Sequence, residues 1–314
     1  MKTITGYFKA YFREGINRPL YIYTAVFIAA CITINYVFDF ERTVLDPFFG
    51  YASGFLVFFL FYAFAYYMIA IPGAFMLKRT QMLKDHRFWL KSIIFIGLIG
   101  MMAGFYHYFK LLPYFQDASD RVMVRKILSN LKRFIPYIVV LFLTQKIFDK
   151  DIKGIYGLRF RGTALKPYFV LLLLVSPLIL WASFQPDFLK TYPKFNYWQV
   201  GDAFGLNTWI NGAVFETCYG LDFVSTELIF RGALIIGMVS VMGKDALLPM
   251  VATYAFLHFG KPMAETISSV FGGYILGIIA MYSRHIMGGV IIHIGLAWLM
   301  ELTAILQHLH GNYH

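Results

Sequence analysis

The chain has 314 residues, of which 59% are hydrophobic and only 14% are charged, and its mean hydropathy is +0.62. Because soluble domains carry about 25% charged residues, this composition excludes an ordinary soluble domain and indicates an integral membrane protein. The formal net charge of +11 comes from short basic clusters between apolar segments, as the positive-inside rule expects. We therefore expect a multi-pass membrane protein with no nucleic-acid partner.

The first part of the chain predicts a series of membrane-spanning helices. Residues 1–19 are basic and aromatic and indicate an interfacial segment on the cytoplasmic side. The predicted spans are 19–38, 52–77, 88–109, 134–148 and 167–185. Basic loops at 78–91 and 146–166 should also lie in the cytoplasm, and the acidic loop 39–46 on the opposite side. Residues 110–133 carry charges of both signs and indicate an amphipathic helix at the interface.

The last third of the chain predicts further helices. Residues 204–242 form one long apolar helix or a broken pair, since three glycines interrupt them. Further helices are predicted at 246–259, at 265–282 and from residue 288 onward. Gly273 and Gly277 have the spacing of a close helix contact. The expected fold is an all-α, polytopic membrane bundle of roughly eight or nine spans around a polar cavity.

A carboxylate and a guanidinium, Glu227 and Arg231, lie four residues apart in an apolar segment, where one helix face would let them pair. Ionisable groups at membrane depth are expensive and usually mark a water-filled cavity or a functional site. The alternative is a buried ion pair that only joins two helices. Because Arg231 favours the charged form of Glu227, this carboxylate could take a proton from water as a general base.

Two histidines and three further carboxylates accompany this pair in apolar surroundings. His258 and His293 offer a second base and a donor to a developing oxyanion, or each is a core histidine bonded to a backbone carbonyl. Glu265 begins a helix, where it either complements the helix dipole or joins the site. Glu301 follows His293 by two turns and either orients it or lies at the membrane interface. Glu216 shares a helix face with Glu227 and could line an access path.

These residues resemble the motifs of the CPBP family, a group of intramembrane endopeptidases that includes CAAX prenyl proteases and bacteriocin-processing enzymes. The family motifs are Glu-Glu-x-x-x-Arg, Phe-x-x-x-His and His-x-x-x-Asn. The matching positions in this chain are, in order, Thr226-Glu227 with Arg231, Tyr254 with His258, and His293 with Ala297. The chain therefore has Thr for the first Glu, Tyr for Phe, and Ala for Asn.

The resemblance implies about eight helices around a wet cavity and hydrolysis of a peptide bond within or near the membrane. In the family the first Glu and the His of the second motif activate water, and the last His and Asn stabilise the oxyanion. Thr226 cannot act as a carboxylate base, and Ala297 cannot donate a hydrogen bond. Either Glu227 serves as the base with Glu265 as the second carboxylate, or the protein keeps the fold without proteolysis.

We predict an intramembrane peptidase that hydrolyses a membrane-associated peptide or protein with Glu/His-activated water, in the inner membrane of a bacterium. The predicted catalytic residues are Glu227, His258, His293 and Glu265, and the supporting residues are Arg231, Thr226, Tyr254, Ala297 and Glu301. Glu227, Arg231, His258 and His293 should converge on one cavity. The sequence is divided into membrane spans with basic loops at 1–166 and a catalytic core at 167–314.

Two other functions remain open, an inactive membrane scaffold or binding protein of the same fold and a proton-coupled transporter. The lack of an internal sequence repeat disfavours the transporter. Two His and a Glu could hold zinc, but no His-Glu-x-x-His helix is present, so we expect a metal-free glutamate mechanism without a cofactor.

Overall fold

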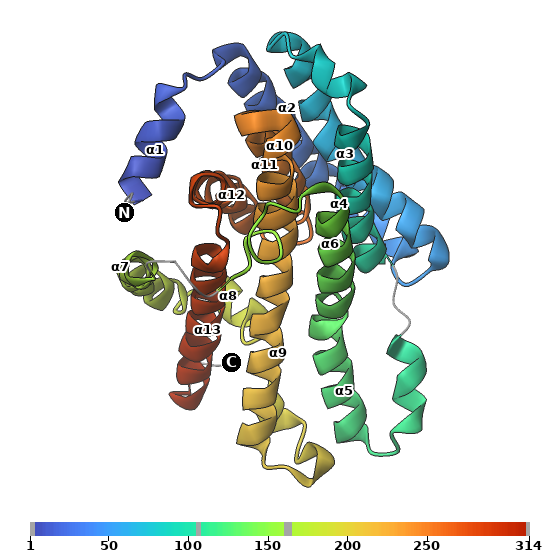
Figure 1. Ribbon diagram of the computed structural model, residues 1–314. Helices are drawn as coiled ribbons and strands as arrows, with labels where there is room; N and C mark the ends of the chain where they lie inside the picture. Colours follow the sequence, from blue (N-terminus) through green and yellow to red (C-terminus); the bar gives the residue numbers. More distant parts are fainter. Residues whose placement is uncertain (1–3, 105–107, 160–164, 312–314) are drawn as a thin grey trace. The chain divides into compact units, whose positions relative to one another are not determined.

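A computed structural model describes residues 4–104, 108–159 and 165–311, and every regular element in these ranges is helical (Figure 1). Six helical stretches of this described part are long and apolar enough to cross a membrane: Arg18–Phe38, Ala52–Met76, Ala118–Phe148, Thr208–Phe256, Met263–Ser283 and Met287–Leu309. The prediction of an all-α membrane protein is therefore confirmed. The predicted spans at 88–109 and 167–185 correspond to α4 (His86–Gly104) and α7 (Lys166–Ala182), which are not among the six. The number of eight or nine spans stays a prediction.

Helix ends follow local sequence signals. α2 (Arg18–Phe38) begins after Asn17, whose side chain accepts a hydrogen bond from the Leu20 amide at 3.0 Å, and it ends at Asp39 in the left-handed conformation. This is an N-cap with a proline in the first turn, as helix starts prefer. α5 (Ala118–Leu131) begins in the same way after Asp117, which accepts from the Ser119 amide at 2.7 Å. A helix is therefore present within the segment 110–133, whereas its position at the membrane interface stays a prediction, because α5 is part of the apolar stretch Ala118–Phe148.

Contacts within the chain divide it into two compact units, which are described separately. Unit 1 comprises Met1–Tyr106, Val139–Arg159 and Leu228–Ile286. Unit 2 comprises His107–Ile138, Phe160–Glu227 and Met287–His314. This division follows packing, whereas the boundary proposed at residue 166 follows the sequence motifs and stays a prediction.

Unit 1 contains α1 (Ile4–Arg13), α2, α3 (Ala52–Met76), α4, η7 (Leu228–Gly237), α10 (Val239–Met242), η8 (Gly243–Ala246), α11 (Leu247–Phe256) and α12 (Met263–Ser283). In this unit α11 packs against both α3 and α12. A Cβ at Gly277 would lie 2.5 Å from Cδ1 of Leu247, and one at Gly273 would lie 3.0 Å from Cδ1 of Tyr254. The predicted Gly-x-x-x-Gly contact therefore exists, and it joins α12 to α11.

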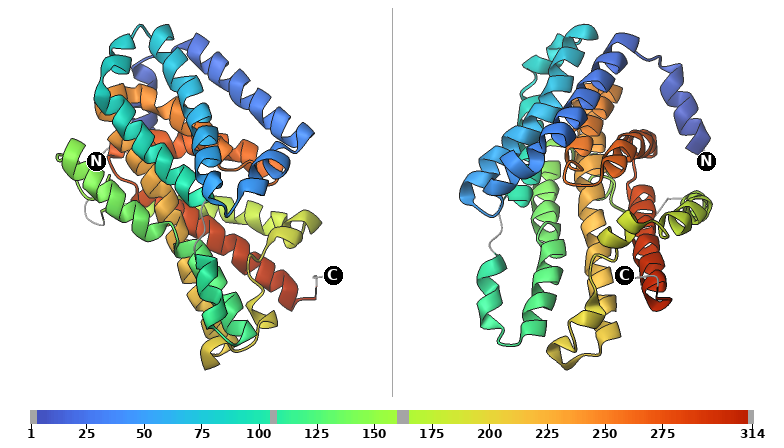
Figure 2. Two further views of the ribbon diagram at one scale, coloured as in Figure 1. Left: turned by 90° about the vertical axis from the view of Figure 1, so that its right-hand side faces the viewer. Right: turned by 180° about the vertical axis from the view of Figure 1, so that it is seen from behind.

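Unit 2 contains α5, α7, α8 (Pro186–Thr191), α9 (Thr208–Glu227) and α13 (Met287–Leu309). The long helices α9 and α13 lie side by side, α7 packs on α13 and α5 packs on α9 (Figure 2). A small aromatic core joins α5 and α9 to the segment 192–207 through Met123, Phe195, Tyr197, Ala203 and Phe215. The buried surface of α13 in this unit thus faces α9 and α7.

The chain changes from α-helix to π-helix directly after Glu227. The ten residues of η7 are all buried, and they include Arg231. Gly232 and Gly237 are five residues apart, which matches the i to i+5 bonding of a π-helix, and both face Tyr156. A Cβ at Gly237 would lie 2.7 Å from Cε1 of Tyr156. The segment that contains Arg231 is therefore wider than the α-helix expected from the sequence, and Tyr156 packs against both of its glycines. The pairing of Glu227 with Arg231 stays a prediction.

A buried ion pair in unit 1 holds the end of η7. Lys91 on α4 is 1% exposed, and its Nζ lies 2.7 Å from Oδ2 of Asp149. The same ammonium donates to the carbonyl of Gly237, and the Tyr156 hydroxyl donates to Asp149 at 2.9 Å. Buried charges need such partners on every side. The network joins α4, the loop after α6 (Phe134–Phe148) and η7.

Candidate functional site

The first half of the candidate site is a contact between Glu227 and His293 in unit 2. Oε1 of Glu227, at the end of α9, lies 2.7 Å from Nδ1 of His293 on α13. The Glu227 side chain is fully buried, and that of His293 is 17% exposed. A carboxylate at Nδ1 fixes the orientation of an imidazole and leaves Nε2 for another partner. The structure thus brings two of the predicted catalytic residues together.

A glycine in α13 leaves space for this carboxylate against the helix backbone. Gly289 lies one turn before His293, and a Cβ at this position would overlap Oε2 of Glu227. The ring of Phe223 stacks on His293 with 5.9 Å between centroids and 14° between planes. The position of the imidazole is therefore set by a carboxylate on one ring nitrogen and an aromatic ring on its face.

Two of the three positions that depart from the family motifs, Thr226 and Ala297, lie in unit 2. The Thr226 hydroxyl donates to the carbonyl of Asp222 at 3.2 Å, which is an ordinary helix-side contact. Ala297 follows His293 by one turn and is 2% exposed. Thr226 has no carboxylate to act as a base, and Ala297 has no group that could donate to an oxyanion.

The second half of the candidate site surrounds Tyr254 in unit 1. The guanidinium carbon of Arg231 lies 4.2 Å from the centroid of the Tyr254 ring, and the ring of His258 lies 4.6 Å from it at 67°. Nδ1 of His258 lies 2.9 Å from the carbonyl oxygen of Tyr254. Because a carbonyl only accepts, Nδ1 carries the hydrogen and neutral His258 has its lone pair on Nε2. This backbone bond is the one expected of a core histidine, and it also leaves Nε2 as a basic nitrogen.

The loop that carries His258 is held by α2, which sequence reasoning did not predict. Nδ2 of Asn35 donates to the carbonyl of Phe259 at 3.0 Å, and the Tyr36 hydroxyl donates to that of Lys261 at 2.6 Å. The Thr266 hydroxyl donates to the carbonyl of His258 itself at 2.5 Å. The sequence does contain an indication of this contact, because Asn35 carries a polar amide near the end of an apolar span.

A further carboxylate lies against this loop. A Cβ at Gly260 would come within 2.5 Å of Oε1 of Glu41, which lies in the acidic segment after α2. Burial raises the pKa of Glu41 to about 7, and the carboxylates of Asp46 and Asp39 contribute in the same direction. Because this contact joins segments more than 200 residues apart, no local sequence pattern indicated it.

Two of the other predicted residues make contacts of their own. Glu265 lies in the first turn of α12, and its Oε1 is 3.4 Å from Nζ of Lys261, with both side chains about one-third exposed. This arrangement is typical of a helix-start carboxylate, whereas its catalytic role stays a prediction. Glu301 is buried, and both of its oxygens accept from the Lys194 amide at 3.0 Å. Glu216 lies beside Glu301, so these two carboxyls border the segment that follows α8.

The structure therefore arranges the predicted residues in two groups, Glu227 with His293 in unit 2 and Arg231 with Tyr254 and His258 in unit 1. The convergence of the two groups on one cavity stays a prediction. Within the described residues, no three His, Cys, Asp or Glu side chains gather as they would around a metal ion. Both cysteines, Cys31 and Cys218, are free.

Comparison with protein-family models, curated proteins and solved structures finds no match for this chain. The resemblance to the CPBP family therefore depends on the motif residues of this sequence alone.

Proposed function

We propose that the protein is an intramembrane peptidase that hydrolyses a peptide bond of a membrane-associated substrate. The observation that carries the proposal is the 2.7 Å contact between the fully buried Glu227 carboxylate and Nδ1 of His293. A carboxylate–imidazole pair in an apolar segment is costly to keep, and such groups usually serve a function. The orientation of His258, with its lone pair on Nε2, adds a second basic nitrogen.

In the proposed mechanism Glu227 or His258 takes a proton from a water molecule, and the resulting hydroxide attacks the carbonyl carbon of the substrate. The carbonyl π electrons move to oxygen, which becomes an oxyanion. With both of its ring nitrogens protonated, His293 donates Nδ1–H to Glu227 and Nε2–H to this oxyanion. The oxyanion electrons then return to the carbonyl as the C–N bond breaks, and the proton taken from water passes to the leaving amine nitrogen, which yields a carboxylic acid and an amine.

Arg231 would act through its neighbours. Its guanidinium lies on the face of Tyr254, whose backbone carbonyl fixes the His258 tautomer. Arg231 is therefore a positioning residue in this proposal, and the Lys91–Asp149 pair fixes the far end of its helix.

The test is cleavage of a library of membrane-inserted peptides by the purified full-length protein, with products identified by mass spectrometry. Glu227→Gln and His258→Gln should each lower kcat by about 10²–10⁴, and His293→Gln by about 10²–10³. His86→Gln, at an exposed histidine, is the matched control and should retain activity. Equal cleavage by wild type and Glu227→Gln would overturn the proposal.

A second candidate function is a membrane scaffold that binds a partner without cleaving it. The observation that favours it is the Thr226 hydroxyl, which bonds to the Asp222 carbonyl at the position where the family has a glutamate. Under this function wild type would cut no peptide, and Glu227→Gln would leave the cellular phenotype of the protein unchanged.

A further inference from the structure

Unit 1 contains a cavity of about 340 Å³ at the start of α2, away from the candidate site. One wall is the turn between α1 and α2, and the others are the end of α3 and the η8 turn. Gly15 has a φ of +75° and lets the chain turn sharply here. The residues that carry the argument are Glu14, Ile16, Leu20, Arg79, Lys244 and Asp245.

The polar wall of this cavity is held in place by bonds within unit 1. Nζ of Lys244 donates to the carbonyl of Glu14 at 2.8 Å and to that of Gly15. Oε1 of Glu14 accepts from the Tyr282 hydroxyl at 2.5 Å. These bonds keep an ammonium group at the mouth of the cavity, and its positive charge is not neutralised by the two carbonyls.

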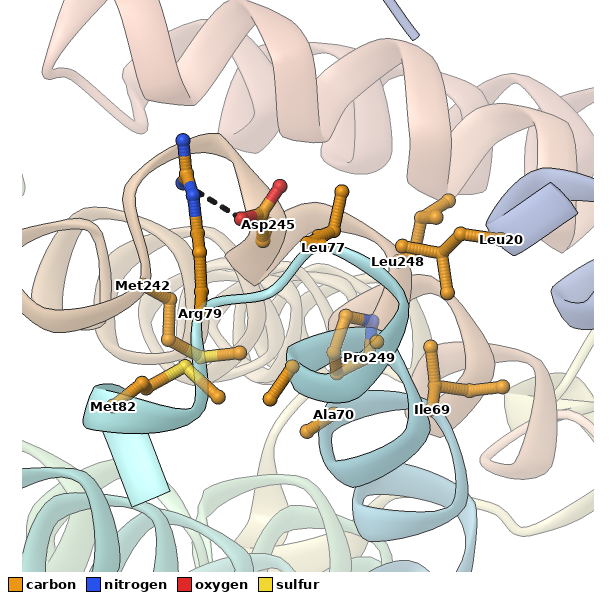
Figure 3. Close-up of a pocket in the computed structure, with 12 residues that line it drawn as sticks. Leu20, Ile69, Ala70, Leu77, Arg79, Met82, Met242, Asp245, Leu248 and Pro249 are labelled. Atoms are coloured by element: carbon orange, nitrogen blue, oxygen red, sulfur yellow. Dashed lines mark hydrogen bonds and ion pairs between the residues drawn. The ribbon is translucent and has the colours of Figure 1, made fainter. Parts of the chain in front are cut away.

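Arg79 provides the second cation. Its Nη1 lies 2.8 Å from Oδ2 of Asp245, and its side chain is 57% exposed (Figure 3). Asp245 takes one of the five N–H donors of a guanidinium, which leaves donors for a second acceptor. Phosphate and carboxylate groups match this donor geometry best.

The surrounding chain is strongly basic. Residues 9–18, 78–85 and 244–245 together contain seven Lys and Arg but only three Asp and Glu. Basic residues clustered at the cytoplasmic end of membrane helices attract anionic lipid headgroups. The lining itself holds two cations, Arg79 and Lys244, and two carboxylates, Glu14 and Asp245, so the excess of positive charge that attracts an anion comes from the flanking residues of these segments.

The other side of the cavity is apolar. Leu20, Leu77 and Leu248 line both this cavity and the narrow crevice beside it (Figure 3). Ile16 at the rim is 44% exposed, and Phe75 in the last turn of α3 is 62% exposed. A ligand here would meet cations at one end and hydrocarbon at the other, at the level where two apolar helices begin and end.

We propose that this cavity binds the phosphate headgroup of an anionic phospholipid from the leaflet at this end of α2, with the acyl chains along the exposed apolar side chains. Lys244 and Arg79 would contact the phosphate oxygens by charge-assisted hydrogen bonds. This function is separate from proteolysis and does not depend on Glu227, His258 or His293.

The experiment measures the thermal stability of the full-length protein in a neutral detergent during titration with phosphatidylglycerol, phosphatidylcholine or inorganic phosphate. Phosphatidylglycerol should raise Tm in a saturable way, and the other two should not at equal phosphate concentration. Lys244→Gln should weaken the apparent Kd about tenfold, as expected for the loss of one charge-assisted bond. Lys150→Gln, at an exposed lysine outside the cavity and outside these basic segments, is the matched control.

A second variant keeps the proposal testable if Lys244→Gln does not fold. Ile16→Trp should fill the cavity and abolish the phosphatidylglycerol effect, whereas Ile22→Trp, at a 64% exposed position outside the cavity, should not. Equal stabilisation by both lipids, or no response of the phosphatidylglycerol effect to Ile16→Trp, would overturn the proposal. Stabilisation by inorganic phosphate alone would also overturn it and assign the cavity to a soluble phosphate compound.

Discussion

The absent side chain of Gly289 makes room for the carboxylate of Glu227, which lies directly against the backbone of α13. Gly289→Ala should therefore displace this carboxylate and weaken its contact with His293. Overpacking of this kind typically costs about 1–3 kcal/mol. We expect a lower Tm in detergent and, for an active peptidase, a loss of turnover.

The control for this change is Gly272→Ala on α12, where a Cβ would meet nothing within 4 Å. Ala is favoured over Gly in a helix by up to about 1 kcal/mol, so this variant should be as stable as wild type or more stable. Equal behaviour of the two variants would contradict the packing of Glu227 on Gly289.

The second prediction concerns the buried pair of Lys91 and Asp149. Lys91→Met or Asp149→Asn should each destabilise the protein by about 3–5 kcal/mol, because each leaves one charge buried without its counter-charge. The double variant should recover part of this loss, since it removes both charges. The measurement is the midpoint of thermal unfolding in detergent. Lys150→Met, at the exposed neighbour of Asp149, should be close to neutral.

The third prediction is a pH dependence caused by Glu41. Its pKa is about 7 in the folded protein and near 4.5 in the unfolded chain, so the folded state binds more protons between these values. Stability should therefore fall as pH rises from about 4.5 to about 7. Glu41→Gln should remove this slope, as measured by Tm across the same range. An unchanged slope in this variant would assign the pH dependence to another group.

The fourth prediction separates two explanations of the Thr226 departure. If this position is only a lost base, Thr226→Glu should raise peptidase activity, because a second carboxylate beside Glu227 supplies an acid–base partner. If Glu265 has taken over the role, Thr226→Glu should add nothing or reduce activity by like-charge repulsion. Glu265→Gln should then abolish turnover without loss of folding.

The fifth prediction is topological. Single cysteines at Lys84 and Lys150, in a variant without Cys31 and Cys218, should resist an impermeant thiol reagent in intact cells. A cysteine at Thr43, which is exposed in the acidic segment after α2, should be labelled readily. Labelling at Lys84 with protection at Thr43 would reverse the orientation.

Helix positions could be predicted from the sequence because hydropathy and end signals are local. The predicted span 19–38 is α2 at Arg18–Phe38, and the predicted span 52–77 is α3 at Ala52–Met76. The π-helix at Leu228–Gly237 could not be predicted in this way. All ten of its side chains are buried, so the sequence shows no apolar face whose period would distinguish a wide helix from an α-helix.

The sequence predicts which residues belong to the candidate site, but not how they are arranged. Glu227 and His293 are ionisable groups in apolar segments, which is why the sequence predicts them as site residues, and their contact is present in unit 2. The tautomer of His258 depends on one carbonyl, and the position of its loop depends on Asn35 and Tyr36 on a distant helix. Such contacts are decided by tertiary packing, which a single sequence does not encode in any local pattern.

The buried partnership of Lys91 also has a consequence for how the protein is made. Lys91 is synthesised 58 residues before Asp149, so at about 5–20 residues per second the lysine waits roughly 3–12 s for its counter-charge. During that interval the ammonium group has its lowest free energy in water, so the first turns of α4 should stay at the membrane surface. The membrane position of α4 stays a prediction, and on that prediction its complete insertion follows translation of the loop that carries Asp149. A nascent chain truncated before that loop should then leave α4 accessible from the cytoplasm.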